Sequence, residues 1–253
     1  MAKSKKKKYY LLFTATILFL ILNISCQTYI KRFAETNNNK PPERILFIGD
    51  SLTYWNMGVY YHVQSLAESE TPPRKIIVDS ITKGSTPLGG LWLKAQTIIK
   101  EGKYDLVVLQ DDLGETSRSG FLEYAKKYND LINQYGSKSI LYMHYWYSYL
   151  KLTPKELKEI YGDVAKELKI PLSPVNIAYE YAVRERPSLE LMVADFIHPT
   201  WAGTYLISCV LYSTIFGRSP VGLQYNPTIA QLTTEEIMFL QDIAWRAVKE
   251  FKI

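Results

Sequence analysis

The chain has 253 residues, of which 47% are hydrophobic and 22% charged, and this composition indicates an ordinary globular protein rather than a disordered one. Two cysteines exclude a disulfide scaffold, and the glycine and proline content excludes a collagen-like chain. The formal net charge of +5 comes from five lysines among the first eight residues; without them, 25 basic residues face 25 acidic ones. A neutral body has no positive surface for a phosphate backbone, so no nucleic-acid partner is expected.

The first 30 residues have the pattern of an export signal or a membrane anchor. The lysines are followed by an uncharged, apolar run from Tyr9 to Ile24. Uncharged sequence continues to Ile30, about the 20 residues that a helix needs to cross a bilayer, so an uncleaved anchor is one interpretation. In either case the lysines stay in the cytoplasm and the folded part lies outside it.

The alternative to an uncleaved anchor is cleavage and lipidation. The segment Leu22 to Cys26 resembles a bacterial lipoprotein box, in which the lipidated Cys becomes the new N-terminus. Leu22 stands four rather than three positions before Cys26, and Asn23 occupies the usual Leu position. We favour lipidation at Cys26, which predicts a lipoprotein held on the membrane in the periplasm or at the cell surface.

A polar tether is expected between this segment and the folded domain. Residues 27–42 end in Asn37-Asn38-Asn39-Lys40-Pro41-Pro42, which has nothing to bury. The chain is therefore divided into a signal or anchor (1–26), a tether (27–42) and one folded domain (43–253). Cys209 lies in an apolar run, so a buried, inert thiol and no disulfide are predicted.

From residue 43, short apolar runs alternate with helical periods, which is typical of a parallel sheet covered by helices on both faces. Strands are expected at 44–48, 75–78, 105–109, 139–143 and 172–175. Helices are expected at about 59–69, 91–101, 120–135 and 154–168, from Pro199 to Phe216, and after Thr233. Capping boxes mark two of the helix starts, Thr153 with Glu156 and Thr233 with Glu236. In such a sheet ligands bind at the carboxyl ends of the strands.

The first expected strand ends in Gly49-Asp50-Ser51-Leu52-Thr53. A serine at this strand-to-helix turn can expose its hydroxyl beside backbone N–H groups that face a developing oxyanion. Taken alone, the Gly-Asp-Ser tripeptide is more typical of a helix cap or a simple turn than of a nucleophile.

A serine nucleophile needs a base, and the chain has three histidines. His198 has the most suggestive context, since Asp195 precedes it by three residues in a loop that leads into a helix, and one bent segment could deliver both an imidazole and an orienting carboxylate. His62 is expected to be structural, whereas His144, at the end of the fourth strand, is a candidate for lining the pocket. The scattered histidines lack the pattern of a zinc site, so no metal or other cofactor is expected.

The blocks Ile48 to Thr53 and Asp195 to Pro199 together resemble the SGNH, or GDSL, hydrolase superfamily, in order, separation and position over residues 44–216. The resemblance implies a three-layer α/β/α sandwich with a five-stranded flavodoxin-like parallel sheet, and a metal-free serine esterase. Carried over by position, Ser51 is the nucleophile, His198 the general base and acid, and Asp195 the residue that orients His198.

The resemblance also implies an oxyanion hole made by the N–H groups of Ser51 and of a glycine in the family's second block. Gly84 is the expected glycine, and Gly89-Gly90, which otherwise forms a hinge before the next helix, is the alternative. The third block normally supplies an asparagine, but this chain has Gln110 after the third strand. Either Gln110 presents its amide to the oxyanion, or it caps the strand and the hole is weakened, which typically costs about 10²- to 10³-fold in rate.

Aromatic residues gather around the end of the fourth expected strand, and His144 and Trp146 are the candidate substrate-binding residues among them. Such rings can stack on sugar faces or fill space beneath a loop. The function predicted is hydrolysis of a small acyl ester, acetyl on a glycan being the most economical substrate. The alternatives are a cell-envelope acyltransferase and a non-catalytic glycan-binding or scaffold lipoprotein.

Overall fold

The computed structural model describes residues 43–252. The predicted signal or anchor, the lipidation site Cys26 and the tether lie outside the described residues. Within the described range no helix is long and apolar enough to span a membrane.

The described domain is built on one five-stranded sheet in which every pair of neighbouring strands is parallel. The strand order is β2-β1-β3-β4-β5. The strands are β1 (Arg44–Gly49), β2 (Ile77–Thr82), β3 (Leu106–Leu109), β4 (Lys138–Met143) and β5 (Leu172–Pro174). Chain order reverses between β1 and β3, which is where ligands bind in doubly wound folds.

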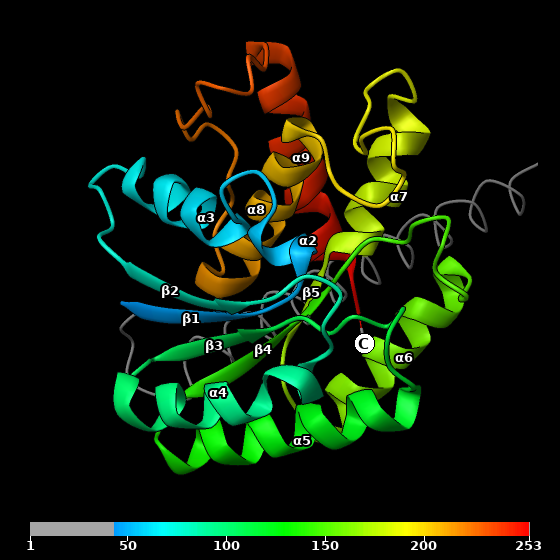
Figure 1. The fold of residues 1–253 in the computed structure, drawn as a ribbon. Helices are drawn as coiled ribbons and strands as arrows, with labels where there is room; N and C mark the ends of the chain where they lie inside the picture. Colours follow the sequence, from blue (N-terminus) through cyan, green and yellow to red (C-terminus); the bar gives the residue numbers. More distant parts are fainter. Residues whose placement is uncertain (1–42, 253) are drawn as a thin grey trace, which may run out of the picture. The chain divides into compact units, whose positions relative to one another are not determined.

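Helices cover both faces of the sheet (Figure 1). On one face lie α4 (Leu88–Gly102), α5 (Arg118–Gln134) and α6 (Pro154–Leu168). The other layer contains α3 (Val59–Glu68), α7 (Val175–Glu185), α8 (Trp201–Phe216) and α9 (Thr234–Glu250), and the short α2 (Ser51–Tyr54) follows β1. The predicted three-layer α/β/α sandwich with a five-stranded parallel sheet is confirmed.

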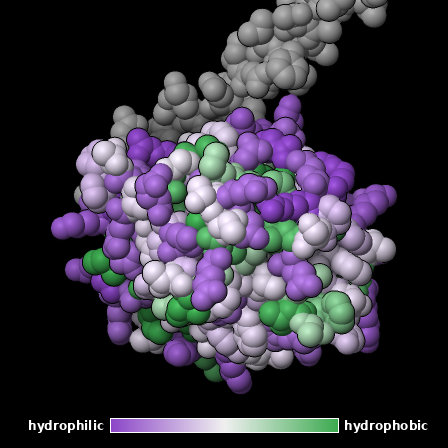
Figure 2. Space-filling view, turned by 90° about the horizontal axis from the view of Figure 1, so that it is seen from above, coloured by the Kyte–Doolittle hydropathy of each residue, from purple (hydrophilic) through white to green (hydrophobic). Residues whose placement is uncertain are grey.

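Helix α8 forms the centre of its layer, since it packs against α3, α7 and α9. Nearly all of its residues are buried, including Cys209, a free thiol that is 0% exposed. A helix that is apolar on every side is expected in a core. The face of the molecule seen in Figure 2 is mainly hydrophilic, with hydrophobic side chains in small separate patches.

The predicted second strand, 75–78, is displaced along the chain from β2. β2 lies at the edge of the sheet and is partly exposed, so its backbone pairing with β1 extends through the polar residues Asp79 and Ser80. The ion pair between Arg44 and Asp79, 3.0 Å long, joins the two strands on that surface. The prediction followed the apolar run and therefore ended the strand too early, because about half of the residues of an edge strand face water and are polar.

The helices also differ in part from expectation. α4 begins at Leu88 rather than Leu91, because the Asp111 carboxylate accepts a hydrogen bond from the Leu88 N–H (2.5 Å) and thereby caps the helix from another loop. α5 begins at Arg118 because the Ser117 hydroxyl accepts from the Gly120 N–H (3.1 Å). Helix α7 was not predicted, and the expected fifth strand ends one residue early where α7 begins.

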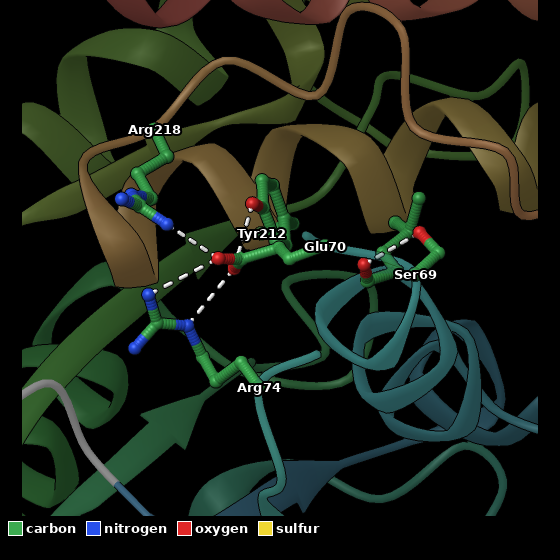
Figure 3. Close-up of polar contacts among 6 residues, drawn as sticks. Ser69, Glu70, Arg74, Tyr212 and Arg218 are labelled. Carbon is green, nitrogen blue, oxygen red and sulfur yellow. Dashed lines mark hydrogen bonds and ion pairs between the residues drawn. The ribbon is translucent and has the colours of Figure 1, made fainter. Parts of the chain in front are cut away.

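A buried carboxylate ties α3 to the end of α8 (Figure 3). Glu70 is 7% exposed and accepts hydrogen bonds from Arg74 (2.9 and 3.2 Å), from the Tyr212 hydroxyl (2.9 Å) and from Arg218. Burial alone would raise the pKa of Glu70, but the hydrogen bonds from Arg74 and Tyr212 and the charge of Arg218 hold it below its ordinary value. This cluster therefore needs its carboxylate ionised.

We expect Glu70→Gln to lower the free energy of unfolding by about 1–3 kcal/mol at pH 7, since two guanidinium groups lose their counter-charge while Arg218 can still be hydrated. The folded-state pKa is lowered, so the stabilisation is complete above pH 4.5 and is lost as the pH falls through the folded pKa. Urea unfolding at several pH values measures this. Glu68→Gln, at the exposed last residue of α3, is the control, and an equal effect of both substitutions would refute a specific role for Glu70.

Candidate active site

Ser51, His198 and Asp195, far apart in sequence, form one hydrogen-bonded chain. The Ser51 Oγ lies 3.0 Å from the Nε2 of His198, and the Nδ1 of His198 lies 2.7 Å from the Oδ2 of Asp195. Because a carboxylate only accepts, Nδ1 carries the proton and Nε2 is left to accept from the serine hydroxyl. This is the arrangement in which an imidazole can remove a proton from a hydroxyl.

The loop that carries Asp195 and His198 is bent by the aspartate itself. The Oδ1 of Asp195 accepts from the N–H groups of Ile197 (2.8 Å) and His198 (2.9 Å), which turns the chain so that Oδ2 reaches the imidazole. Phe196, between them, has a φ of 55°. Burial would raise the pKa of Asp195, but the hydrogen bonds from the His198 side chain and from both amides together lower it below the ordinary value.

The turn that carries Ser51 is determined by its neighbours. The Asp50 side chain accepts from the Leu52 N–H (2.7 Å) and so caps α2, with Ser51 at the first position of the helix. Gly49 has no room for a side chain, since an added Cβ would lie 2.3 Å from the Thr53 Oγ1 and 2.4 Å from the Gln110 Oε1. The Gly-Asp-Ser motif therefore acts as a helix cap that also presents a serine.

Gln110 lies directly behind this turn and is 0% exposed. Its Oε1 accepts from the Asp50 N–H (2.8 Å) and the Thr53 hydroxyl (2.9 Å), and its Nε2 donates to the Asp111 carbonyl (2.9 Å). The two donors fix the orientation of the amide, because only the oxygen can accept from them. Of the two predicted alternatives, these bonds favour a Gln110 that caps the end of its strand over an amide that faces an oxyanion, and they hold the turn of Ser51 in place.

The amides of Ser51 and Gly84 remain available as oxyanion donors. The Lys83 N–H donates to the Gly49 carbonyl (3.3 Å), so the chain after β2 continues beside the end of β1. A Cβ on Gly84 would lie 2.9 Å from the Tyr54 hydroxyl, which brings Gly84 next to α2. Neither the Ser51 nor the Gly84 N–H donates to an acceptor within the part of the chain that is described.

The alternative glycines lie elsewhere. Gly89 and Gly90 are in the first turn of α4 rather than in a hinge. A Cβ on Gly89 would lie 2.7 Å from the Tyr124 ring, on α5, so this glycine allows close packing of two helices. The structure therefore favours Gly84 over Gly89-Gly90.

Three acidic side chains are buried behind the serine. Asp50, Asp111 and Asp112 are 4%, 1% and 7% exposed. Burial, together with the charge of Asp112, raises the pKa of Asp50 to about 7, and burial raises that of Asp111 to about 6. The nucleophile turn is therefore adjacent to a carboxyl group that binds a proton near neutral pH.

We expect the thermal unfolding midpoint of the wild-type protein to decrease as the pH rises from 5 to 8. The reason is that folded Asp50 still holds a proton that the unfolded chain has released above pH 3.8. Asp50→Asn keeps an oxygen that caps α2 but cannot ionise. The decrease in the unfolding midpoint between pH 5 and pH 8 should therefore be smaller by several degrees in this variant. One unit of pKa shift corresponds to about 1.4 kcal/mol, and 1 kcal/mol moves the midpoint by about 2–4 °C. Differential scanning calorimetry across this range measures it. Parallel curves for both proteins would contradict the raised pKa.

His144 is not at the surface, contrary to expectation. It is 0% exposed, its Nδ1 bonds the Tyr145 carbonyl (2.7 Å), and burial lowers its pKa to about 4. Its ring lies beside Tyr147 and Tyr161. His144 directly follows β4 and its ring is buried between aromatic side chains, so the predicted role in lining the pocket is not available to it in this conformation.

The rest of the aromatic group supports loops rather than forming a sugar platform. Trp146 is partly exposed, but its Nε1–H donates to the Leu152 carbonyl (2.5 Å). Tyr145 is buried, stacks on Tyr179 at 4.1 Å between ring centroids, and donates its hydroxyl to the Ile197 carbonyl (2.5 Å) in the loop of His198. Stacking on a glycan at this position remains a prediction for Trp146 alone.

Sequence reasoning missed two residues that touch His198 or its loop. The Trp55 ring stacks on the His198 imidazole, and the Asn56 side chain bonds the Pro199 carbonyl. Both residues come shortly after the serine motif in the sequence, but the direction of their side chains depends on the loop conformation. Among residues 43–252, no group of three or more His, Cys, Asp or Glu side chains is arranged to hold a metal ion.

Comparison with solved structures shows the same fold in hydrolases. A candidate SGNH hydrolase from Slackia heliotrinireducens is 22% identical with a TM-score of 0.57, and the match covers 68% of this chain and 97% of that one. A catalytic mutant of an acetylxylan esterase from Geobacillus stearothermophilus is 16% identical (TM-score 0.54; 68% and 94% covered). A DUF4886 family protein from Bacteroides uniformis is 16% identical (TM-score 0.60; 81% and 94% covered). The chain has the SGNH hydrolase fold.

Neither a family model nor a curated protein matches the sequence.

Proposed function

We propose that the protein is a serine hydrolase of the SGNH type that cleaves small acyl esters, with acetyl esters of glycans as the first substrates to try. The observation that carries the proposal is the hydrogen-bonded chain from Ser51 through His198 to Asp195. Ser51 directly follows the carboxyl end of β1, the edge at which doubly wound sheets bind ligands, and His198 reaches it from the loop before α8.

The reaction begins when Ser51 attacks the ester carbonyl and its proton passes to the Nε2 of His198. Asp195 keeps the proton on Nδ1 and stabilises the imidazolium. The alcohol then leaves with the proton from His198, and an acyl-enzyme remains on Ser51. Water, deprotonated by His198, releases the acid in the second half of the cycle.

The developing oxyanion is held by the N–H groups of Ser51 and Gly84. Both are backbone donors that are fixed before the reaction starts, so they need no reorganisation when charge develops. In this mechanism Gln110 contributes indirectly, by holding the turn from which Ser51 and its amide project.

Besides Trp146, the candidates for ring contacts with a sugar are the exposed rings of Tyr54 (37% exposed) and Phe196 (57% exposed), which lie close to Ser51 and His198 in sequence. The solved structures of the same fold include acetylxylan esterases, which supports acetyl esters as the first class to test.

The enzyme acts outside the cytoplasm, held at the membrane by its N-terminal segment. This part of the proposal rests on the sequence of residues 1–30. Intact-mass analysis of membrane-extracted protein tests it. Lipidation predicts an acylglyceryl group on Cys26 as the first residue, whereas retention of residues 1–25 would favour the uncleaved anchor.

A transferase that passes the acyl group to a sugar hydroxyl is the nearest alternative, since it shares the acyl-enzyme. Mass spectrometry of an acetylated oligosaccharide, incubated with and without an acyl donor, separates the two. Loss of acetyl alone supports hydrolysis, and gain of acyl supports transfer. A scaffold lipoprotein without turnover would give neither change.

A further inference from the structure

Trp55 contacts both members of the Ser51–His198 pair. Its indole ring lies on the face of the His198 imidazole, with 3.9 Å between ring centroids and 17° between ring planes. Its backbone N–H donates to the Ser51 carbonyl (2.8 Å) at the end of α2. The indole therefore covers one face of a ring whose two nitrogens are already bonded to Ser51 and Asp195.

The loop after Trp55 has an unusual backbone. Asn56, Met57 and Gly58 have φ values of 50°, 74° and 88°, three successive residues in the left-handed region. Residues other than glycine adopt this conformation only when their surroundings impose it, and such strain is concentrated at functional sites. Since Met57 is 51% exposed, its own side chain does not explain the conformation.

Asn56 fastens this loop to the other half of the site. Its Nδ2 donates to the Pro199 carbonyl (3.0 Å) and to the Thr204 hydroxyl (2.9 Å). Pro199 directly follows His198, and Thr204 lies in the first turns of α8. The loop of Trp55 and the loop of His198 are thus held in one fixed arrangement.

His62, on α3, holds the same loop from the other side. It is 1% exposed; its Nε2 lies 2.7 Å from the Asn56 carbonyl and its Nδ1 lies 2.7 Å from the Tyr225 hydroxyl. A carbonyl can only accept, so Nε2 carries the proton and the neutral ring accepts from Tyr225 at Nδ1. This histidine is structural, as the sequence indicated, but what it supports is the loop beside the site.

We infer that Trp55 is a positioning residue that holds the His198 ring in its bonded orientation and stabilises the imidazolium that forms when His198 takes the proton of Ser51. The inference rests on the proposed function. The face of an indole attracts a cation, so the stack is stronger when His198 has taken the proton of Ser51 than before. A contact that strengthens in this way lowers the barrier rather than merely binding substrate.

The test compares Trp55→Phe, which keeps an aromatic face, with Trp55→Leu, which keeps apolar volume without one. For p-nitrophenyl acetate we expect Trp55→Leu to lower kcat about 10-fold or more with KM within about twofold, and Trp55→Phe to retain most of the rate. Unfolding midpoints identify any variant that is simply misfolded.

The NMR chemical shifts of the histidine rings give a readout that does not need turnover. The chain has three histidines, so the His198 ring signal can be identified by its loss in His198→Ala. In wild type the stacked indole should shift this signal upfield relative to Trp55→Leu. Equal chemical shifts and rates in the Leu and Phe variants would overturn the inference. Absence of turnover in wild type with the NMR difference intact would instead overturn the proposed function.

Discussion

Replacing Ser51 with alanine is expected to remove nearly all hydrolysis of p-nitrophenyl acetate, a loss of at least about 10³-fold in kcat. The substitution deletes the one atom that attacks the ester, while the fold around α2 depends on Asp50, Thr53 and Gln110 rather than on the serine hydroxyl. The unfolding midpoint should therefore stay close to that of wild type. Initial rates of nitrophenol release, corrected for spontaneous hydrolysis, measure the effect.

His198→Ala should approach the same low rate, because the hydroxyl then has no base within reach. Residues of such a chain act as a unit, so the double variant should be scarcely slower than either single one. Ser119→Ala, on the exposed surface of α5, is the matched control and should be fully active. An unchanged rate in Ser51→Ala or in His198→Ala would remove the role assigned to that residue.

Gln110→Ala should lower both stability and activity. Truncation leaves the Asp50 N–H and the Thr53 hydroxyl buried without their acceptor, and it opens a cavity in a site that is 0% exposed. We expect a loss of about 2–4 kcal/mol in the free energy of unfolding, and about a 10²-fold loss in kcat/KM as the nucleophile turn shifts. Urea unfolding and ester hydrolysis on the same preparation measure the two effects.

Gln110→Met is the informative partner of this variant, since it fills the space without accepting hydrogen bonds. If Gln110 holds the turn, both variants lose stability together with activity. If Gln110 instead donated to the oxyanion, kcat would fall about 10²- to 10³-fold while the unfolding free energy stayed unchanged. That second pattern would contradict the role that the hydrogen bonds of Gln110 indicate.

Much of the fold follows from local sequence. β1, β3 and β4 are buried on both faces, so each appears as an apolar run with nearly correct bounds. The two capping boxes are formed as predicted, at Thr153 and Thr233. The predicted bounds were wrong where groups distant in the sequence determine the structure. The edge strand β2 is extended by pairing with β1, and α4 starts early because Asp111 caps it.

In the candidate site, too, the features set by local sequence were predictable and those set by distant contacts were not. The Asp195 and His198 pair is predictable because both residues lie in one short turn that the aspartate itself stabilises. The approach of Ser51 to His198 could be inferred only from the resemblance, since it depends on the topology of the whole sheet. The orientations of Gln110, His144 and Trp55 could not be inferred, because each is set by packing against residues far away in the sequence.

Labelling by a fluorophosphonate probe tests most directly whether Ser51 is an activated nucleophile. The probe should add one phosphonyl group to the wild-type protein, located on Ser51 by peptide mass spectrometry, and should add none to Ser51→Ala. Modification should be much slower in His198→Ala. A wild-type protein that takes no label, in a tube where a known serine esterase is fully labelled, would contradict the account.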